Sequence, residues 1–192
     1  MKDTASNSIS HVAGFDDAPF HHDSRGNVLI VGTVFSGHRL DGVLSAQVRR
    51  DGVNSTNVLI DLLHNSRFYP QLQAVFLQGI AFGGFNVIDI QRLHTELELP
   101  VIVISRVKPN LAKIKSALLD KVPGGRKKWQ LIEKAGPMEK VRDVYVQRVG
   151  LDRDKTSKLI ARFAVNSVVP EPLRTAHLIA GGVVLGESRH RV

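Results

Sequence analysis

Residues 28–49, VLIVGTVFSGHRLDGVLSAQVR, hold two β-type runs separated by a short turn, and the expected fold class follows from this pattern. Residues 28–35 are almost entirely apolar and β-favouring, which is typical of a strand buried on both faces. Gly37 marks the turn, and residues 42–49 then alternate between two faces, as strand side chains do. Because so short a connection cannot make a parallel crossover, the two runs are expected to pair antiparallel.

Outward from this hairpin, strands and helices follow one another in a regular order. Residues 11–15 predict a strand before it, and residues 74–77, 101–105 and 144–149 predict strands after it. Helices are expected from Ser55 or Thr56 as N-cap and around residues 86–97, 112–119, 126–135, 155–165 and 172–185. Strands that alternate with helices favour parallel pairing. We predict an α/β fold with a mixed five- to six-stranded sheet flanked by helices, the ribonuclease-H-like architecture. A flavodoxin-like sheet is the alternative, but it lacks the opening antiparallel strands.

The length and composition fit one domain. The 192 residues allow a single core, with residues 1–10 expected to be a flexible N-terminus and residues 11–192 one domain. The absence of cysteine excludes disulfides and thiolate metal sites. No apolar run is long enough to cross a membrane, and the N-terminus lacks the apolar core of a secretory signal. A cytoplasmic protein is expected, and a homo-oligomer is compatible with the sequence.

The charge balance points to an anionic partner. Lys and Arg total 26 against 18 Asp and Glu, so the net charge is +8 and the pI is near 10.0. Such an excess attracts polyanions, and we expect contact with DNA or RNA. The candidate contact residues are Arg49 and Arg50, and Arg126, Lys127 and Lys128 beside Trp129. Trp129 is suited to base stacking, although an amphipathic helix with its tryptophan in the core explains the same pattern.

Two strand ends carry the candidate catalytic residues. Asp16 and Asp17 end the first strand, and Gln78 ends a later one, followed by Gly79, a candidate nucleic-acid contact at the start of a glycine-containing loop that can receive a phosphate. Ligands of α/β sheets bind at the carboxyl ends of parallel strands, so Gln78 approaches Asp16 if the two strands are neighbours. Clustered oxygens suit Mg²⁺ or Mn²⁺, which activate water for phosphodiester cleavage. The alternatives are an acidic turn closed by Pro19, and a glycine-containing loop that serves only tight turns.

Several segments resemble the endonuclease V group of nucleases. HVAGFDDAPF (11–20) is similar to its first-strand metal motif, AVFLQG (74–79) to its second metal strand and ELPVIVISR (98–106) to the strand after that. VVPEPLRTAH (168–177) resembles a run near its C-terminus. GGFNVIDI (83–90) and GESRHRV (186–192) are similar to an endonuclease-V-like archaeal branch of unknown function.

The resemblance implies a ribonuclease-H-like fold, Mg²⁺ dependence, a role in DNA repair and hydrolysis near deaminated bases such as hypoxanthine or uracil. It makes Asp16 the first-strand metal ligand and Asp17 the additional acid of the branch. Where the group has its second aspartate, this chain has Gln78, and Asn54–Asn57 offer no carboxylate for its glutamate. Asp51 is the nearest acid and becomes the third candidate ligand. Val149-Gly150 stand where the group has Gly-His.

Three functional classes stay open on this sequence. The first is a metal-dependent endonuclease that acts on deaminated or modified nucleic acid. The second is a catalytically impaired nucleic-acid-binding protein of the same fold, because two expected acids are replaced. The third is an interaction scaffold or another phosphoryl-transfer enzyme.

Overall fold

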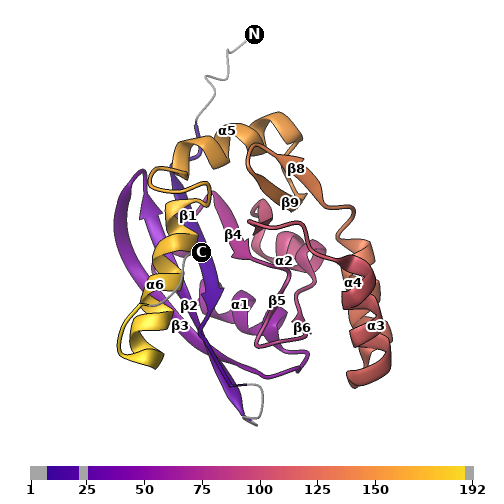
Figure 1. The fold of residues 1–192 in the computed structure, drawn as a ribbon. Coiled ribbons are helices and arrows are strands. Elements are labelled where there is room, and N and C mark those ends of the chain that lie inside the picture. The colour runs from indigo at the N-terminus through magenta and orange to yellow at the C-terminus, as the bar shows by residue number, and fades with distance from the viewer. Residues whose placement is uncertain (1–7, 22–25, 189–192) are drawn as a thin grey trace.

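A seven-stranded mixed sheet forms the centre of the molecule in the computed structural model, which describes residues 8–21 and 26–188 (Figure 1). Its strands are β1 (His11–Asp17), β2 (Asn27–Ser36), β3 (Arg39–Arg49), β4 (Ala74–Gln78), β7 (Val101–Ser105), β8 (Glu139–Val141) and β9 (Val144–Val149). They lie in the order β3-β2-β1-β4-β7-β9-β8. β1, β4 and β7 run parallel, and the strands on either side pair antiparallel. This is the expected ribonuclease-H-like arrangement.

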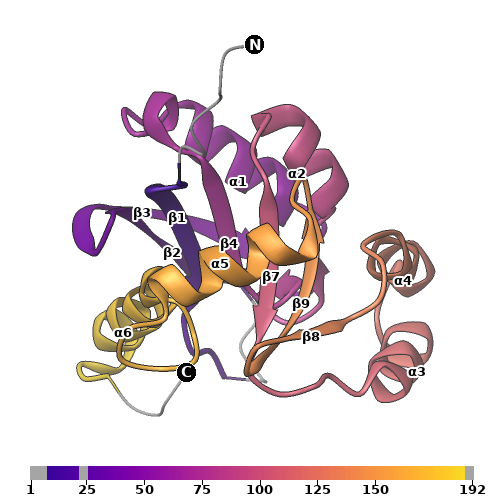
Figure 2. The same cartoon turned by 90° about the horizontal axis from the view of Figure 1, so that it is seen from above.

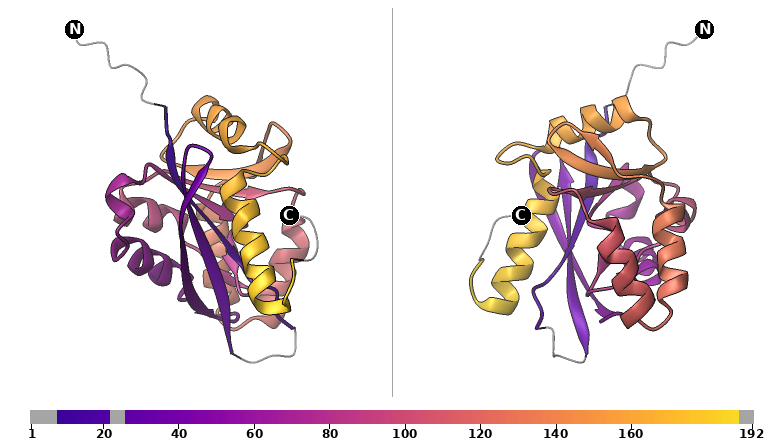
Figure 3. Two further views of the ribbon diagram at one scale, coloured as in Figure 1. Left: turned by 90° about the vertical axis from the view of Figure 1, so that its left-hand side faces the viewer. Right: turned by 45° about the vertical axis from the view of Figure 1, so that its right-hand side comes forward.

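The helices cover both faces of the sheet. They are α1 (Ser55–His64), the 3-10 helix η1 (Tyr69–Gln71), α2 (Ile90–Leu97), α3 (Leu111–Lys121), α4 (Gly125–Lys134), α5 (Arg153–Phe163) and α6 (Glu171–Leu185). Seen from above, α1 and α2 lie on one face and α5 and α6 on the other (Figure 2). α3 and α4 pack side by side beyond β9, while α6 runs along β1 and β2 (Figure 3). The sheet therefore has a buried core on each face.

The prediction of five to six strands was too low by one, and one strand direction differs from the expected parallel pairing. β8 has only three residues, too few for a visible alternation, and it forms a hairpin with β9. Arg142 turns that hairpin with φ 56°. β9 consequently pairs antiparallel with β7, although two helices separate them along the chain.

The helix expected over residues 86–97 begins later. Asn86–Val87 form β6, which pairs with β5 (Ala81–Phe82) in a small hairpin. The helix α2 starts at Ile90, and Asp89 is its N-cap: the Asp89 carboxylate accepts a hydrogen bond from the Arg92 backbone N–H at 3.0 Å. The other helices lie within a few residues of their predicted ranges.

Polar contacts hold the start of α1. Its N-cap is Asn54, not Ser55 or Thr56. The Asn86 side chain accepts from the Ser55 backbone N–H at 3.0 Å and donates to Asn54 at 2.8 Å. Thr56 Oγ1 accepts from the Asp89 backbone N–H at 3.0 Å. The segment between β5 and α2 is therefore tied to α1.

The ends of the chain fall partly outside the described residues. Of the expected N-terminal segment, residues 1–7 are outside, while the Ser10 backbone N–H donates to Gln73 at 2.7 Å and Arg162 donates to Ser8 Oγ at 2.7 Å. None of the helices in the described ranges is long and apolar enough to cross a membrane.

Candidate active site

Asp16 lies at the carboxyl end of β1, next to the end of β4. β1 and β4 pair in parallel with Phe15 opposite Leu77, so the next residues along the two strands, Asp16 and Gln78, stand side by side. Side chains alternate along a strand, and both residues therefore face away from the core that holds Phe15 and Leu77. The predicted proximity of the two strand ends is confirmed.

The Asp16 carboxylate is almost fully buried and has a histidine partner. Asp16 is 4% exposed, and its Oδ2 lies 2.8 Å from His177 Nδ1 on α6. Its Oδ1 accepts from the Asp17 backbone N–H at 2.9 Å. Burial raises the pKa of Asp16, and His177 opposes that rise. The hydrogen bond to Asp16 in turn raises the pKa of His177, which favours the imidazolium.

Gln78 carries a buried oxygen with no hydrogen-bond partner. Among the residues that the structure describes, no donor contacts Gln78 Oε1, and this atom is closed to solvent. A buried polar atom without a partner costs about 1–3 kcal/mol. The oxygen lies at the end of β4, next to the end of β1 that carries Asp16, and is suited to a ligand that offers a hydrogen or a positive charge.

Asp17 points to the opposite face and holds a glycine loop. Its Oδ2 accepts from the Gly83 backbone N–H at 2.7 Å. Burial, reinforced by the negative charge of Asp16, raises the pKa of Asp17 to about 6. Two adjacent aspartates thus have separate partners, a histidine on one face and a loop on the other.

Asp51 holds the same loop from the turn after β3. Its Oδ1 accepts from the Phe85 backbone N–H at 2.8 Å, and its own N–H donates to the Gly83 carbonyl at 2.9 Å. Gly84 has φ 86°, and a Cβ there would overlap Asp51 Oδ1. Asp51 therefore positions residues 83–85.

The expected metal trio of Asp16, Asp17 and Asp51 does not form one cluster. Within residues 8–21 and 26–188, no three His, Asp or Glu side chains are grouped as metal ligands. Strand alternation separates Asp16 from Asp17, and Asp51 faces the loop. Mg²⁺ is, however, commonly held by one or two protein oxygens together with water and substrate phosphate. The Asp16 carboxylate and the unpartnered Gln78 Oε1 fit that smaller donor set.

The basic residues have different environments. Arg49, Arg126 and Lys127 are exposed. Arg50 donates to the His21 carbonyl at 3.3 Å and lies 5.6 Å from the ring centroid of Phe20. Lys128 is only 2% exposed, and its Nζ donates to the Asp51 carbonyl. Burial lowers the pKa of Lys128, and its side chain joins α4 to the β3–α1 turn.

The position of Trp129 fits an amphipathic helix with its tryptophan in the core more closely than a base-stacking role. The ring is partly buried in a small apolar cluster of α3 and α4, with Lys115 Nζ 5.1 Å from its centroid. Its Nε1 donates to Glu133 at 2.6 Å.

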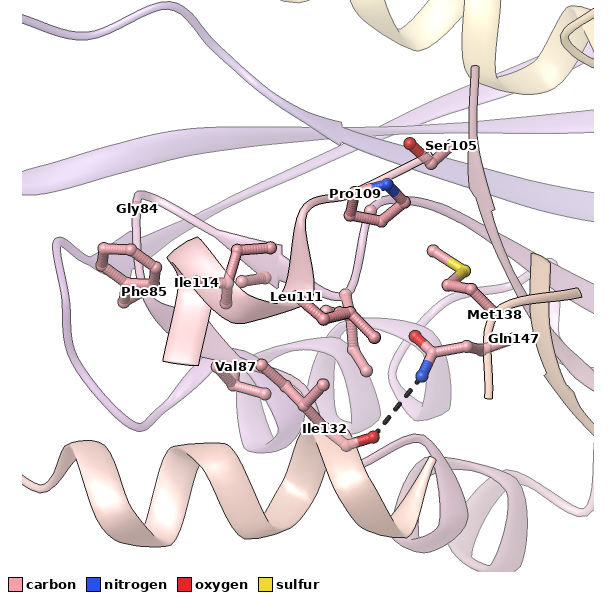
Figure 4. A pocket seen from close by; sticks show the side chains of 13 residues that line it. Gly84, Phe85, Val87, Ser105, Pro109, Leu111, Ile114, Ile132, Met138 and Gln147 are labelled. Carbon is pink, nitrogen blue, oxygen red and sulfur yellow. Dashed lines mark hydrogen bonds between the residues drawn. The ribbon is translucent and has the colours of Figure 1, made fainter. Parts of the chain in front are cut away.

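An apolar cavity of about 240 Å³ begins at Gly79, one residue after Gln78 (Figure 4). Gly79 has φ 82°, with open space where a Cβ would lie. Loop residues 79–87 form one wall, and Leu111 and Ile114 of α3 form another. Ile132 of α4 and Gln147 of β9 also line it, and Ser105, Pro109 and Met138 complete the lining. Residues 79–87, whose backbone Asp17 and Asp51 hold, thus lead from the strand end at Gln78 along one wall of the apolar cavity.

Three features of the site were absent from the predicted residues. His177, the partner of Asp16, is 161 positions away and only the packing of α6 on β1 brings it close. The Glu171 carboxylate accepts from Arg174 at 2.8 Å and from the Asn166 backbone N–H at 3.0 Å, which fixes the start of α6. His177 and Glu171 both lie in the segment 168–177, which resembles the endonuclease V group, but the resemblance did not indicate their contacts. Gln147 had no sequence signal.

The fold and the sequence are similar to those of known proteins. Endonuclease V of Ciona intestinalis, in complex with a 24mer DNA containing an inosine, superposes with TM-score 0.55 and 13% identity, covering 91% of this chain and 85% of that chain. A protein of unknown function from Archaeoglobus fulgidus superposes with TM-score 0.85 and 32% identity, covering 91% and 98%. A UPF0215 protein of Deinococcus radiodurans is 51% identical over 180 residues, covering 94% of this chain and 92% of its own. The architecture is that of the endonuclease-V-like nucleases.

The family follows from the sequence match. The endonuclease dU family model matches residues 8–184. The chain belongs to the endonuclease dU family.

Proposed function

We propose that this protein is a metal-dependent endonuclease that hydrolyses a phosphodiester beside a deaminated or modified base in DNA or RNA. The observation that carries the proposal is the position of Asp16 and Gln78, which directly follow the paired residues Phe15 and Leu77 at adjoining parallel strand ends, with Gln78 Oε1 buried and unpartnered. Membership of the endonuclease dU family supports this chemistry. The inosine-containing DNA bound by the Ciona endonuclease V supports the class of substrate.

The Asp16 carboxylate and Gln78 Oε1 would hold Mg²⁺ or Mn²⁺. When bound, such an ion neutralises charge on the phosphate and lowers the pKa of a water. His177 orients the Asp16 carboxylate through its Nδ1, and the hydrogen bond to Asp16 raises the pKa of His177, which favours the charged imidazolium. An imidazolium at this position would stabilise the negative charge that a phosphate gains during hydrolysis.

The cavity beyond Gly79 is proposed to receive the altered base. Enzymes that act on a single base take it out of the stack into a pocket with apolar walls. This cavity begins one residue from Gln78, so a base inside it places its own backbone near the strand ends. Asp17 and Asp51 keep the intervening loop in position through Gly83 and Phe85.

A second candidate is a nucleic-acid-binding protein without hydrolytic activity. The observation that favours it is the lack of a three-ligand acid cluster in the described residues, with a neutral amide at position 78. Binding would then be independent of metal and would weaken steeply with salt.

The test measures cleavage of oligonucleotides with one central deoxyuridine or deoxyinosine, in Mg²⁺, in Mn²⁺ and in EDTA. We expect metal-dependent cleavage that Asp16→Asn lowers by about 100-fold or more, because the charge that holds the ion is lost. Asp61→Asn, on the exposed side of α1, is the matched control and should cleave like the wild type. Equal cleavage by Asp16→Asn and the wild type would refute the site.

Calorimetric titration with Mn²⁺ separates the two candidates. Gln78→Asp should bind Mn²⁺ about tenfold or more tightly than Gln78→Asn, which has the same length without the charge. Binding of nucleic acid without cleavage by the wild type or by Gln78→Asp, in any metal, would establish the second candidate instead.

A further inference from the structure

Gln147 is the single amide side chain in the lining of the cavity, and it is almost fully buried. The lining is otherwise apolar or glycine, apart from Ser105, whose hydroxyl donates to the Val107 carbonyl at 2.6 Å. Gln147 is 2% exposed and lies on β9 opposite Val103. A buried amide in an apolar chamber is costly unless its polar atoms have partners.

The orientation of the Gln147 amide is determined by two backbone carbonyls. Its Nε2 donates to the Gly136 carbonyl at 2.6 Å and to the Ile132 carbonyl at 3.4 Å. An amide nitrogen has two hydrogens, and both are directed to these acceptors. If the amide were flipped, its oxygen would face the carbonyl oxygens of Gly136 and Ile132, and three acceptors would lie together without a donor. Gln147 Oε1 is therefore an acceptor of fixed orientation, turned away from Ile132 and toward the side of Leu111 and Met138 (Figure 4).

No donor within the described residues satisfies Gln147 Oε1. The side chain is held from one side and offers a single acceptor on the other. A ligand that fills the chamber must meet this oxygen. A ligand with an N–H there gains a hydrogen bond, while a ligand with a lone pair there is repelled and leaves the oxygen unpaired.

We infer that Gln147 Oε1 is the specificity-determining acceptor that selects a base with a ring N–H, an inference that rests on the proposed function. Uracil has N3–H and hypoxanthine has N1–H, whereas cytosine N3 and adenine N1 carry a lone pair. Deamination converts the acceptor at this ring position into a donor. One fixed oxygen therefore separates a deaminated base from its parent.

The same chemistry defines what Gln147 does not select. Thymine also has N3–H and guanine N1–H, so the acceptor treats them like uracil and hypoxanthine. Gln147 is therefore not expected to exclude thymine or guanine. Loss of the Gln147 acceptor should consequently change the preference for uracil over cytosine and leave the preference for uracil over thymine unchanged.

The experiment measures binding by fluorescence anisotropy, without metal, of single-stranded oligonucleotides with one central dU, dC, dT or N3-methyl-dU. For Gln147→Met, of similar length and apolar, we expect the dU-to-dC preference to fall about 10- to 100-fold and the dU-to-dT preference to stay the same. Gln130→Met, on the exposed side of α4, is the matched control. N3 methylation should weaken wild-type binding and have no further effect on Gln147→Met, because both changes remove one interaction.

The outcomes separate this inference from the proposed function. Wild-type protein that binds dU, dC and N3-methyl-dU equally would overturn the role of Gln147, even if it cleaves DNA. A dU preference that depends on Gln147, with no cleavage in any metal, would support the acceptor and refute the nuclease. If Gln147→Met does not fold, the wild-type comparison of dU with N3-methyl-dU decides: equal affinities overturn the inference, and a loss on methylation supports it.

Discussion

Asp16 and Asp17 are neighbours in the chain, yet the structure gives their carboxylates different partners. The reason is strand alternation, which turns adjacent side chains to opposite faces. Asp16 meets His177 on the α6 side, and Asp17 meets Gly83 on the other. At the scale of single residues, the proposed chemistry therefore depends on Asp16, while Asp17 holds the loop under electrostatic strain.

That strain predicts a stability change at Asp17. Its pKa is raised from 3.8 to about 6, so the folded state binds a proton more tightly than the unfolded state does. Its contribution to folding is then most favourable below pH 3.8, is lost as the pH rises toward 6 and is constant above it. We expect Asp17→Asn to raise the free energy of unfolding by about 1–3 kcal/mol at pH 8. Urea unfolding at several pH values measures this.

The pH dependence provides the control for Asp17. The stabilisation by Asp17→Asn should shrink as the pH falls from 6 toward 4, because the wild-type carboxyl becomes protonated. A difference between variant and wild type that stays constant from pH 4.5 to pH 8 would show that the carboxylate charge is not its origin.

The segment 79–87, which contains the β5–β6 hairpin, leads from the end of β4 to the cavity. Its backbone is held by Asp17 at Gly83 and by Asp51 at Phe85, and its last residues are joined to the start of α1 through Asn86. A helix pattern over 86–97 concealed the hairpin, because β6 has only two residues. Long-range hydrogen bonds, and not local preference, determine its conformation.

The loop predicts a measurable cost for a methyl group at Gly84. Its φ of 86° is strained for alanine, and the added Cβ would overlap Asp51 Oδ1. We expect Gly84→Ala to lower the free energy of unfolding by about 2–4 kcal/mol. Gly37→Ala, with φ 58° and open space around it, is the matched control and should cost only about 1 kcal/mol. Similar costs in thermal or urea unfolding would show that Asp51 does not constrain the loop.

At the scale of the whole molecule, the positive charge is divided between exposed and structural residues. Arg126 and Lys127 are exposed on α4, whereas Lys128 is buried against the Asp51 carbonyl. A net charge of +8 predicts attraction to polyanions, but it does not indicate which cations are available. Only the exposed ones can neutralise phosphate without breaking the fold.

This division predicts the salt dependence of binding. Replacing both Arg126 and Lys127 by alanine should reduce the slope of log affinity against log salt by about 1–2, because two phosphate contacts are lost. Anisotropy titrations between low and moderate salt measure the slope. Lys155→Ala with Lys158→Ala, exposed on α5, is the charge-matched control. An equal reduction by both pairs would show that net charge alone is measured and that α4 has no specific contact.

The order of elements and the residues at the strand ends could be predicted from the amino-acid sequence. The apolar run of residues 28–35, the turn at Gly37 and the later alternation with helices were sufficient for the mixed sheet, because these patterns are local. The same local reasoning set Asp16 and Gln78 at the ends of their strands, where parallel pairing brings them together.

The groups that those residues contact became known from the folded chain. His177 reaches Asp16 across 161 positions, Lys128 reaches Asp51 across 77, and Gln147 is oriented by carbonyls of α4 and the segment after it. Such contacts arise from the packing of helices on the sheet, and no local pattern encodes them. The candidate ligands could therefore be predicted from the sequence. Their partners, the different contacts of the three aspartates and the orientation of the Gln147 acceptor could not, because they depend on the folded molecule.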